Sequence, residues 1–376
     1  MSSGVSLGEI VRRIGPRYEQ SHRLTRPQRR ALRAISLCRT PALGGHLDQC
    51  SHCGFRHMVW HSCRNRHCPR CQAQARKRWL EERKSELLPV PYFHVVFTVP
   101  DSLNAFALAD PRRFYDILFA ATRETLLVIA ADPKRLGARI GALAVLHTWG
   151  QTLTLHPHVH CVVPAGGFSL DGSHWRGAKR KNFFLPVRVL GRYFRRRFME
   201  MLREALRNDT AFRSRVQDAA GLLARAAGKE WIVYAKRPFG GPEQVLSYLA
   251  AYTHRIAISE RRLIGFDGER VTFTYKDYRD GDREKSMELP ADEFLRRYLL
   301  HVLPERFVRI RYFGFLTNRV RARNLTLARE QLGTAPPQTA EPEHDSSSPR
   351  CPECQVGSMI TIEWIDPRPI EGIDSS

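Results

Sequence analysis

The sequence predicts an α+β protein in which a small metal-dependent region precedes a larger domain of mixed helices and strands. Residues 41–75 are rich in cysteine and histidine but show little apolar periodicity, so we expect this segment to need a bound metal in order to fold. After residue 91, runs of β-branched and aromatic residues alternate with segments of helical periodicity. We therefore expect three parts, at residues 1–90, 91–325 and 326–376.

The elements of these parts follow from local patterns. Residues 1–40 predict basic helical structure, and Arg76–Leu88 predicts a charged helix that Pro89 and Pro91 end. Beyond it, strands are expected at 92–99, 141–149, 152–163, 184–190, 231–235, 256–259, 263–266 and 271–275, and helices at 111–131, 132–142, 190–226, 242–253 and 291–301. After about Gln331 the composition turns to Pro, Thr, Glu and Ser, which is typical of a linker.

The charge balance indicates a polyanionic partner. The 376-residue chain has 60 Lys plus Arg and 38 Asp plus Glu, a net charge of +22, and its pI is near 10.2. Because the excess is spread along the chain, it favours nucleic-acid binding over the alternative of a solvated basic surface. No run of eighteen apolar residues and no secretory leader pattern is present, so we expect a cytoplasmic protein without a transmembrane helix.

The nine cysteines suit metal binding in a reducing compartment better than disulfides. Two CxxC pairs, Cys50 with Cys53 and Cys68 with Cys71, are fourteen residues apart and predict one four-cysteine zinc site. Four cysteine ligands leave no open coordination position, which indicates a structural role for the zinc. The neighbouring Arg64, Arg66 and Arg70 are predicted to contact DNA. A second zinc that uses Cys63, His67 and His46 is an alternative use of the same segment.

Cys351 and Cys354 form half of a metal site near the end of the chain. Either His344 or a second chain completes it, or the pair is idle. Cys161 stands alone in an apolar strand and predicts a core residue.

Histidines in the strand expected at 152–163 predict a catalytic metal site. His158 and His160 have one residue between them, so their side chains leave a strand on the same face and could hold one divalent cation. His156 has the same parity, but Gln151 is the preferred third ligand. Mg²⁺ or Mn²⁺ is the expected ion, although histidine ligands favour Mn²⁺. The alternative is that these histidines are ordinary strand residues.

Tyr248 and Tyr252 lie four residues apart in the helix expected at 242–253. This spacing puts both hydroxyls on one helix face, where tyrosine could act as a nucleophile beside a metal. Core packing is the alternative explanation of two aromatic residues at helical spacing.

Several motifs together resemble the two-tyrosine rolling-circle transposases of the HUH endonuclease superfamily, of the insertion sequence ninety-one kind. The stretches that carry the resemblance, in one consistent order between about residues 5 and 325, are Ser62–Cys71, His156–Pro164 with Gly166 and Gly167, Tyr248–Ser259, and Phe273–Arg279. The resemblance implies a catalytic domain with a central antiparallel sheet flanked by helices. It also implies that His158 and His160 bind the catalytic metal, that Tyr248 and Tyr252 are the nucleophiles, and that Cys50, Cys53, Cys68 and Cys71 bind zinc.

The resemblance further implies that single-stranded element ends and target DNA are the substrates and that host polymerase extends the freed 3′-OH. A 5′-phosphotyrosine would preserve the phosphodiester energy, and Arg255 or Lys276 could favour the phenolate. A replication initiator or relaxase shares this chemistry, and a non-catalytic zinc DNA-binding protein would explain only the charge and the cysteines. A barrel metal hydrolase would need further ligands, which the later histidines do not supply.

Overall fold

The structure is a computed structural model, and it describes residues 5–178, 184–236, 244, 256–334 and 348–368. These residues pack as two units that interleave along the chain. Unit 1 combines 1–75 with 258–296 and 338–376, and unit 2 combines 76–257 with 297–337. The two units are therefore not simply successive stretches of sequence. Residues from the far C-terminal part, expected as linker and tail, belong to the same unit as the N-terminal cysteines.

Unit 1 contains two helices and two small antiparallel sheets among its described residues. One sheet has the order β14-β1-β2 and the other the order β10-β11-β12. Helix α1 begins after Ser6, whose side chain accepts a hydrogen bond from the backbone N–H of Glu9. The elements are α1 (Leu7–Ser21), α2 (Arg26–Leu37), β1 (Gly45–Cys50), β2 (Arg56–Trp60), β10 (Leu263–Phe266), β11 (Arg270–Asp277), β12 (Arg283–Pro290) and β14 (Met359–Ile365), with short 3-10 helices at Pro41–Leu43, Glu260–Arg262 and Tyr278–Asp280.

Unit 2 is built on a sheet of five described strands with the order β13-β5-β6-β3-β9, in which every neighbouring pair is antiparallel. Its strands are β3 (Tyr92–Thr98), β5 (Gly141–Trp149), β6 (Leu155–Pro164), β9 (Val233–Lys236) and β13 (Ile310–Gly314). A second sheet of short strands contains β4 (Ala138–Arg139), β7 (Gly166–Ser169) and β8 (Trp175–Gly177).

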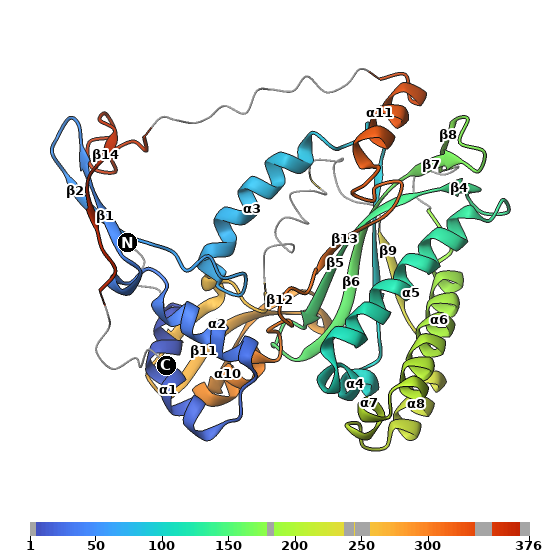
Figure 1. Cartoon of the computed structure of the whole chain (residues 1–376), viewed down its shortest axis with the longest axis horizontal. Coiled ribbons are helices and arrows are strands. Elements are labelled where there is room, and N and C mark those ends of the chain that lie inside the picture. The colour runs from blue at the N-terminus through green and yellow to red at the C-terminus, as the bar shows by residue number, and fades with distance from the viewer. Residues whose placement is uncertain (1–4, 179–183, 237–243, 245–255, 335–347, 369–376) are drawn as a thin grey trace. The chain divides into compact units, whose positions relative to one another are not determined.

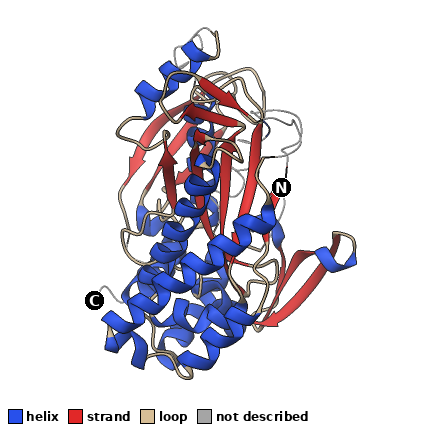
Figure 2. Cartoon of the chain, turned by 90° about the vertical axis from the view of Figure 1, so that its right-hand side faces the viewer, coloured by secondary structure: helices blue, strands red, loops and turns tan. Residues whose placement is uncertain are grey.

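Helices α5 and α6 lie along one face of the five-stranded sheet (Figure 1, Figure 2). The helices of unit 2 are α4 (Asn104–Ala109), which follows a 3-10 turn at Asp101–Leu103, α5 (Pro111–Ala131), α6 (Val187–Asn208), α7 (Thr210–Ser214), α8 (Ala219–Gly228) and α11 (Arg321–Gln331). Two more helices, α3 (Pro69–Lys84) and α10 (Ala291–Leu299), run across the points where the chain passes from one unit to the other.

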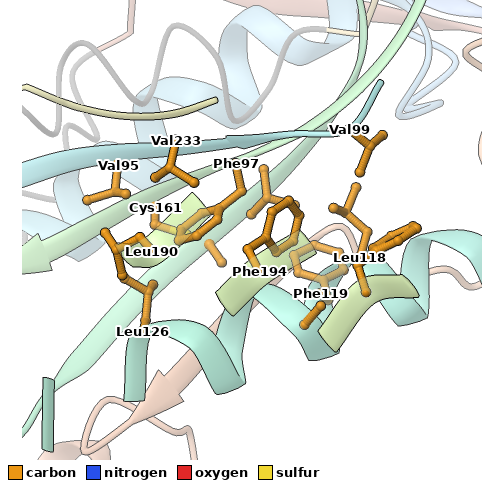
Figure 3. Close-up of a cluster of buried hydrophobic side chains, with 14 of the residues drawn as sticks. Val95, Phe97, Val99, Leu118, Phe119, Leu126, Cys161, Leu190, Phe194 and Val233 are labelled. Carbon is orange, nitrogen blue, oxygen red and sulfur yellow. The ribbon is translucent and has the colours of Figure 1, made fainter. Parts of the chain in front are cut away.

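The main core lies between the sheet and these helices. Alternate residues of β3 and β6, such as Phe97 and Cys161, point toward Phe119 of α5 and Phe194 of α6 (Figure 3). Side chains alternate between the two faces along a strand. His158 and His160 alternate with the core residues of β6, so they lie on the opposite face of the sheet. The core position expected for Cys161 is confirmed, because the residue is fully buried.

The structure confirms the α+β fold class, with a cysteine-rich N-terminal part and a central antiparallel sheet flanked by helices. Three local expectations are wrong. Residues 132–142 are not helical, because Gly137 in a left-handed conformation closes a turn onto Asp132. Residues 184–190 are not a strand, because α6 begins directly after Pro186. Residues 256–259 are not a strand, because Ala257 has a φ of 61°.

Candidate metal centres and family membership

Strands β5 and β6 bring three histidines together in unit 2. In the antiparallel register His147 lies opposite His158, and His160 lies opposite Val145, two residues before His147. One ring nitrogen from each of His147, His158 and His160 lies within 4.8 Å of the others. Residues from adjacent strands that share a face meet in this way, so a short hairpin is sufficient to build a three-nitrogen site.

A hydrogen bond at this cluster shows which ring nitrogen of His158 is available to bind a metal. Its Nδ1 lies 2.6 Å from the backbone carbonyl oxygen of His156. Because a carbonyl only accepts, Nδ1 carries the hydrogen and Nε2 keeps the lone pair that a metal requires. Burial lowers the pKa of His158 to about 3 and holds that of His160 well below its ordinary value. Both imidazoles are therefore neutral at neutral pH, which is the form that binds metal.

A fourth histidine supports the cluster from β3. The His94 Nε2 atom lies 2.7 Å from the Nδ1 atom of His160, and the two rings are stacked with centroids 5.0 Å apart. Burial, aided by the charge of Lys236, lowers the pKa of His94 to about 4. A neutral His94 can accept the Nδ1 hydrogen of His160 and leave Nε2 of His160 as the ligand atom.

His147 is the ligand candidate that sequence reasoning missed. It is 1 % exposed, and its ring centroid lies 4.2 Å from that of His160. The sequence does place His147 in the strand expected at 141–149. Only the register between this strand and the next, however, shows that His147 lies opposite His158. The preferred third ligand, Gln151, lies in the turn between β5 and β6, and His156 is exposed and outside the three-histidine group.

Eight of the nine cysteines form two four-cysteine clusters in unit 1. The first contains Cys38, Cys63, Cys68 and Cys71, and the second contains Cys50, Cys53, Cys351 and Cys354. In the first, Cys71 Sγ lies 3.6 Å from Cys38 Sγ and 3.5 Å from Cys63 Sγ. Tetrahedral zinc with Zn–S bonds of about 2.3 Å would place its sulfurs roughly 3.8 Å apart, so this cluster suits a closed structural zinc site.

The expectation of one zinc site at Cys50, Cys53, Cys68 and Cys71 is wrong in its grouping. The CxxC pairs are separated because β1 and β2 form a hairpin that carries Cys50 and Cys53 to its far end. Each pair then takes two other cysteines as partners. Cys63 is in the first cluster, whereas His67 is hydrogen-bonded to Asn65 and is outside both groups. His344, considered as a partner for Cys351, lies outside the described residues.

Comparison with known proteins identifies the family. The model described as "Transposase zinc-binding domain", of insertion sequence 91, matches residues 10–99, and the model described as "Putative transposase" matches residues 141–324. A curated protein described as "Putative transposase y4qJ" from Sinorhizobium fredii is 50% identical over 97% of this chain and 96% of its own length. The transposase for insertion sequence element IS801 from Pseudomonas savastanoi is 31% identical over 80% of this chain and 73% of its own length.

The chain is a transposase of the insertion sequence 91 family. The predicted resemblance is thereby confirmed, and with it DNA as the partner and zinc as a structural cofactor of the cysteine-rich part. No solved structure matches the transposase. In the described part of the chain, no helix has both the length and the apolar character to span a membrane.

The predicted DNA-binding residues and tyrosine nucleophiles of the transposase lie partly within and partly outside the described residues. Arg64 and Arg70 are exposed near the first cysteine cluster, and Arg70 also pairs with Glu260 at 3.5 Å. Arg66 is half-buried, and Lys276 is exposed on β11. Tyr248, Tyr252 and Arg255, with nearly all of the helix expected at 242–253, lie outside the described residues.

Proposed function

We propose that this transposase nicks single-stranded DNA at the ends of its element through Tyr248 and Tyr252, beside a divalent metal held by His147, His158 and His160. The observation that carries the proposal is the three-histidine cluster on the sheet face opposite α5 and α6. Two ligand residues on one strand and one on its neighbour leave coordination positions for phosphate oxygens and water. Membership of a transposase family supports DNA cleavage as the reaction that such a site serves.

The reaction is a transfer of a phosphoryl group to tyrosine. The bound ion, Mg²⁺ or Mn²⁺, would supply Lewis-acid stabilisation of charge on the phosphate oxygens. The phenol oxygen of one tyrosine bonds to phosphorus while the bond from phosphorus to the 3′ oxygen breaks. The phenol gives up its proton, and the released 3′ oxygen takes one up. The products are a 5′-phosphotyrosine and a free 3′-OH, and no ATP is needed because one phosphodiester replaces another.

Two nucleophiles in one chain support the rolling-circle scheme. While the first tyrosine carries the 5′ end, the 3′-OH can prime host DNA synthesis. The second tyrosine can then cut the next strand and end the round. The histidines support the chemistry by holding Nε2 lone pairs in fixed directions, through the His156 carbonyl for His158 and through His94 for His160.

A covalent-adduct assay tests the proposal. Purified protein is incubated with single-stranded oligonucleotides that cover the element's ends, with Mg²⁺ or Mn²⁺, and resolved on a denaturing gel. We expect an adduct that EDTA abolishes, that Tyr248→Phe or Tyr252→Phe diminishes, and that the double variant lacks. Tyr193→Phe is the matched control, because Tyr193 is on α6, on the opposite side of the sheet from the histidines.

Two results would refute this function. The double tyrosine variant could form the adduct as well as the unaltered protein, or a folded, zinc-loaded protein could form no adduct with any end sequence. The second result would favour a DNA-binding protein without cleavage activity.

A further inference from the structure

The C-terminal tail is an integral strand of the zinc-binding unit. Strand β14 pairs antiparallel with β1 from Gly45 opposite Ile365 to Cys50 opposite Met359, and the two strands run side by side (Figure 1). The chain therefore returns to its N-terminal hairpin after about three hundred intervening residues, since Cys50 and Cys354 are 304 positions apart.

Apolar packing gives this strand little support. Every residue from Ile360 to Trp364 is exposed, and Trp364 is 72 % exposed. The buried residues of the cluster around Met359 are only Met359 itself, Cys50 and Cys351. Closing a loop of this length has an entropic cost, which the antiparallel ladder with β1 and this small apolar cluster must offset. A further link between the tail and the hairpin would stabilise the pairing.

The second cysteine cluster lies at the point where such a link would act, between the turn of the hairpin and the start of the tail strand. Cys50 Sγ is 3.7 Å from Cys354 Sγ, and Cys53 Sγ is 3.7 Å from Cys351 Sγ. These separations match the roughly 3.8 Å between thiolates of a tetrahedral zinc site. They are far longer than the S–S bond of a disulfide, about 2.05 Å.

The backbone around the cluster is arranged for thiolates. The N–H groups of His52 and Cys53 point at Cys50 Sγ at 3.3 and 3.4 Å, and the N–H group of Gly357 points at Cys354 Sγ at 3.4 Å. The two CxxC turns also match each other, because Gly54 N–H donates to the Cys50 carbonyl and Gln355 N–H donates to the Cys351 carbonyl. A Cβ atom on Gly357 would lie 2.5 Å from Cys50 Sγ, so only glycine allows the turns to approach this closely.

We propose that Cys50, Cys53, Cys351 and Cys354 hold a second structural zinc ion, which fastens the C-terminal strand to the N-terminal hairpin. The matched zinc-binding domain ends at residue 99, so two of these four ligands lie outside it. Four thiolates close the coordination shell and leave no position for water, so this ion has no catalytic role. The proposal is independent of the tyrosine chemistry.

Zinc content tests the proposal directly. The Cys351→Ser/Cys354→Ser variant and the unaltered protein are purified alike, washed with a chelating resin, and analysed for zinc per chain by mass spectrometry. We expect the variant to contain one zinc fewer, and Cys38→Ser/Cys63→Ser also to contain one fewer through the other cluster. Cys161→Ala is the matched control, because Cys161 belongs to neither cluster. An unchanged zinc content in Cys351→Ser/Cys354→Ser would overturn the proposal.

Differential alkylation provides a test on the unaltered chain, in case the variant fails to fold. With zinc bound, we expect iodoacetamide to spare Cys50, Cys53, Cys351 and Cys354, and after chelation all four should react together without a reductant. Alkylation of Cys351 and Cys354 at full rate in the zinc-loaded protein would overturn the proposal. Resistance of all four after chelation until a reductant is added would overturn it in favour of disulfides.

Discussion

His94 would act on the proposed metal site through another side chain, because it contacts His160 and does not belong to the three-histidine group. A neutral His94 can accept the hydrogen on Nδ1 of His160, and in that tautomer it fixes the direction of the Nε2 lone pair. Loss of a hydrogen bond that supports a metal-binding histidine typically lowers the metal affinity but leaves the ligands in place. His94 is therefore a positioning residue for the proposed metal.

Replacing His94 should weaken metal binding while the protein remains folded. We expect His94→Ala to lower the affinity for Mn²⁺ by roughly 10–100-fold, since this is the usual effect of losing a partner of a ligating histidine. His94→Gln, which keeps an acceptor, should recover part of the loss. Electron paramagnetic resonance of free Mn²⁺ measures the affinity without reference to activity. Equal affinities for the unaltered protein and His94→Ala would show that His94 does not orient His160.

The hairpin of β5 and β6 determines the geometry of the three-histidine cluster. His301 holds its turn, because His301 Nε2 donates to the Leu153 carbonyl at 3.1 Å and the Thr148 hydroxyl donates to His301 Nδ1 at 3.1 Å. Arg297 adds a hydrogen bond to the Thr152 carbonyl at 3.0 Å. These contacts fix the register that places His147 opposite His158.

The buried His301 predicts how stability depends on pH. Burial lowers its pKa to about 4, from an ordinary value near 6.5, so the folded protein keeps it neutral while the unfolded chain takes up a proton. The contribution to the free energy of unfolding is complete above pH 6.5 and is lost as the pH falls toward 4, by up to about 3 kcal/mol. Urea denaturation between pH 4 and pH 7 measures it. His301→Asn should reduce this slope, and an identical slope in both proteins would contradict the assignment.

The same hairpin shows how far the sequence could predict the site. Strand β5 has the bounds expected from the sequence, because apolar and β-branched residues fill it. The prediction that His158 and His160 share one face of a strand is also confirmed. His147 could not be selected in advance, because its partner is set by the register between strands. The cysteines were grouped by nearness in sequence, but Cys351 reaches Cys53 across 298 positions. Contacts made across such long separations follow from the tertiary fold and are absent from local spacing.

The net charge of +22 attracts the transposase to the phosphates of its DNA. Positive side chains that neutralise phosphates release condensed counterions, so binding weakens as salt rises. The excess of arginine and lysine runs through both the cysteine-rich part and the remainder of the chain. Electrostatic attraction should therefore supply much of the affinity and little of the sequence preference.

Salt dependence gives the corresponding prediction. The logarithm of the association constant for a single-stranded end should fall linearly with the logarithm of salt concentration. Arg64→Ala, which removes an exposed charge beside the first cysteine cluster, should reduce the slope by about 0.7 if Arg64 contacts a phosphate. Fluorescence anisotropy measures both proteins, with Arg213→Ala, an exposed arginine on α7, as the comparison. An unchanged slope for Arg64→Ala would remove Arg64 from the DNA contact.

In the proposed mechanism, His147 completes a metal site that serves DNA cleavage. The most direct measurement is the yield of the covalent DNA adduct as a function of Mn²⁺ concentration for His147→Ala, with His174→Ala as the control because His174 is an exposed histidine outside the cluster. Circular dichroism establishes that each variant is folded. We predict that His147→Ala needs at least tenfold more Mn²⁺ or forms no adduct, while His174→Ala follows the unaltered protein. A folded His147→Ala protein with an unaltered Mn²⁺ dependence would contradict this role of His147.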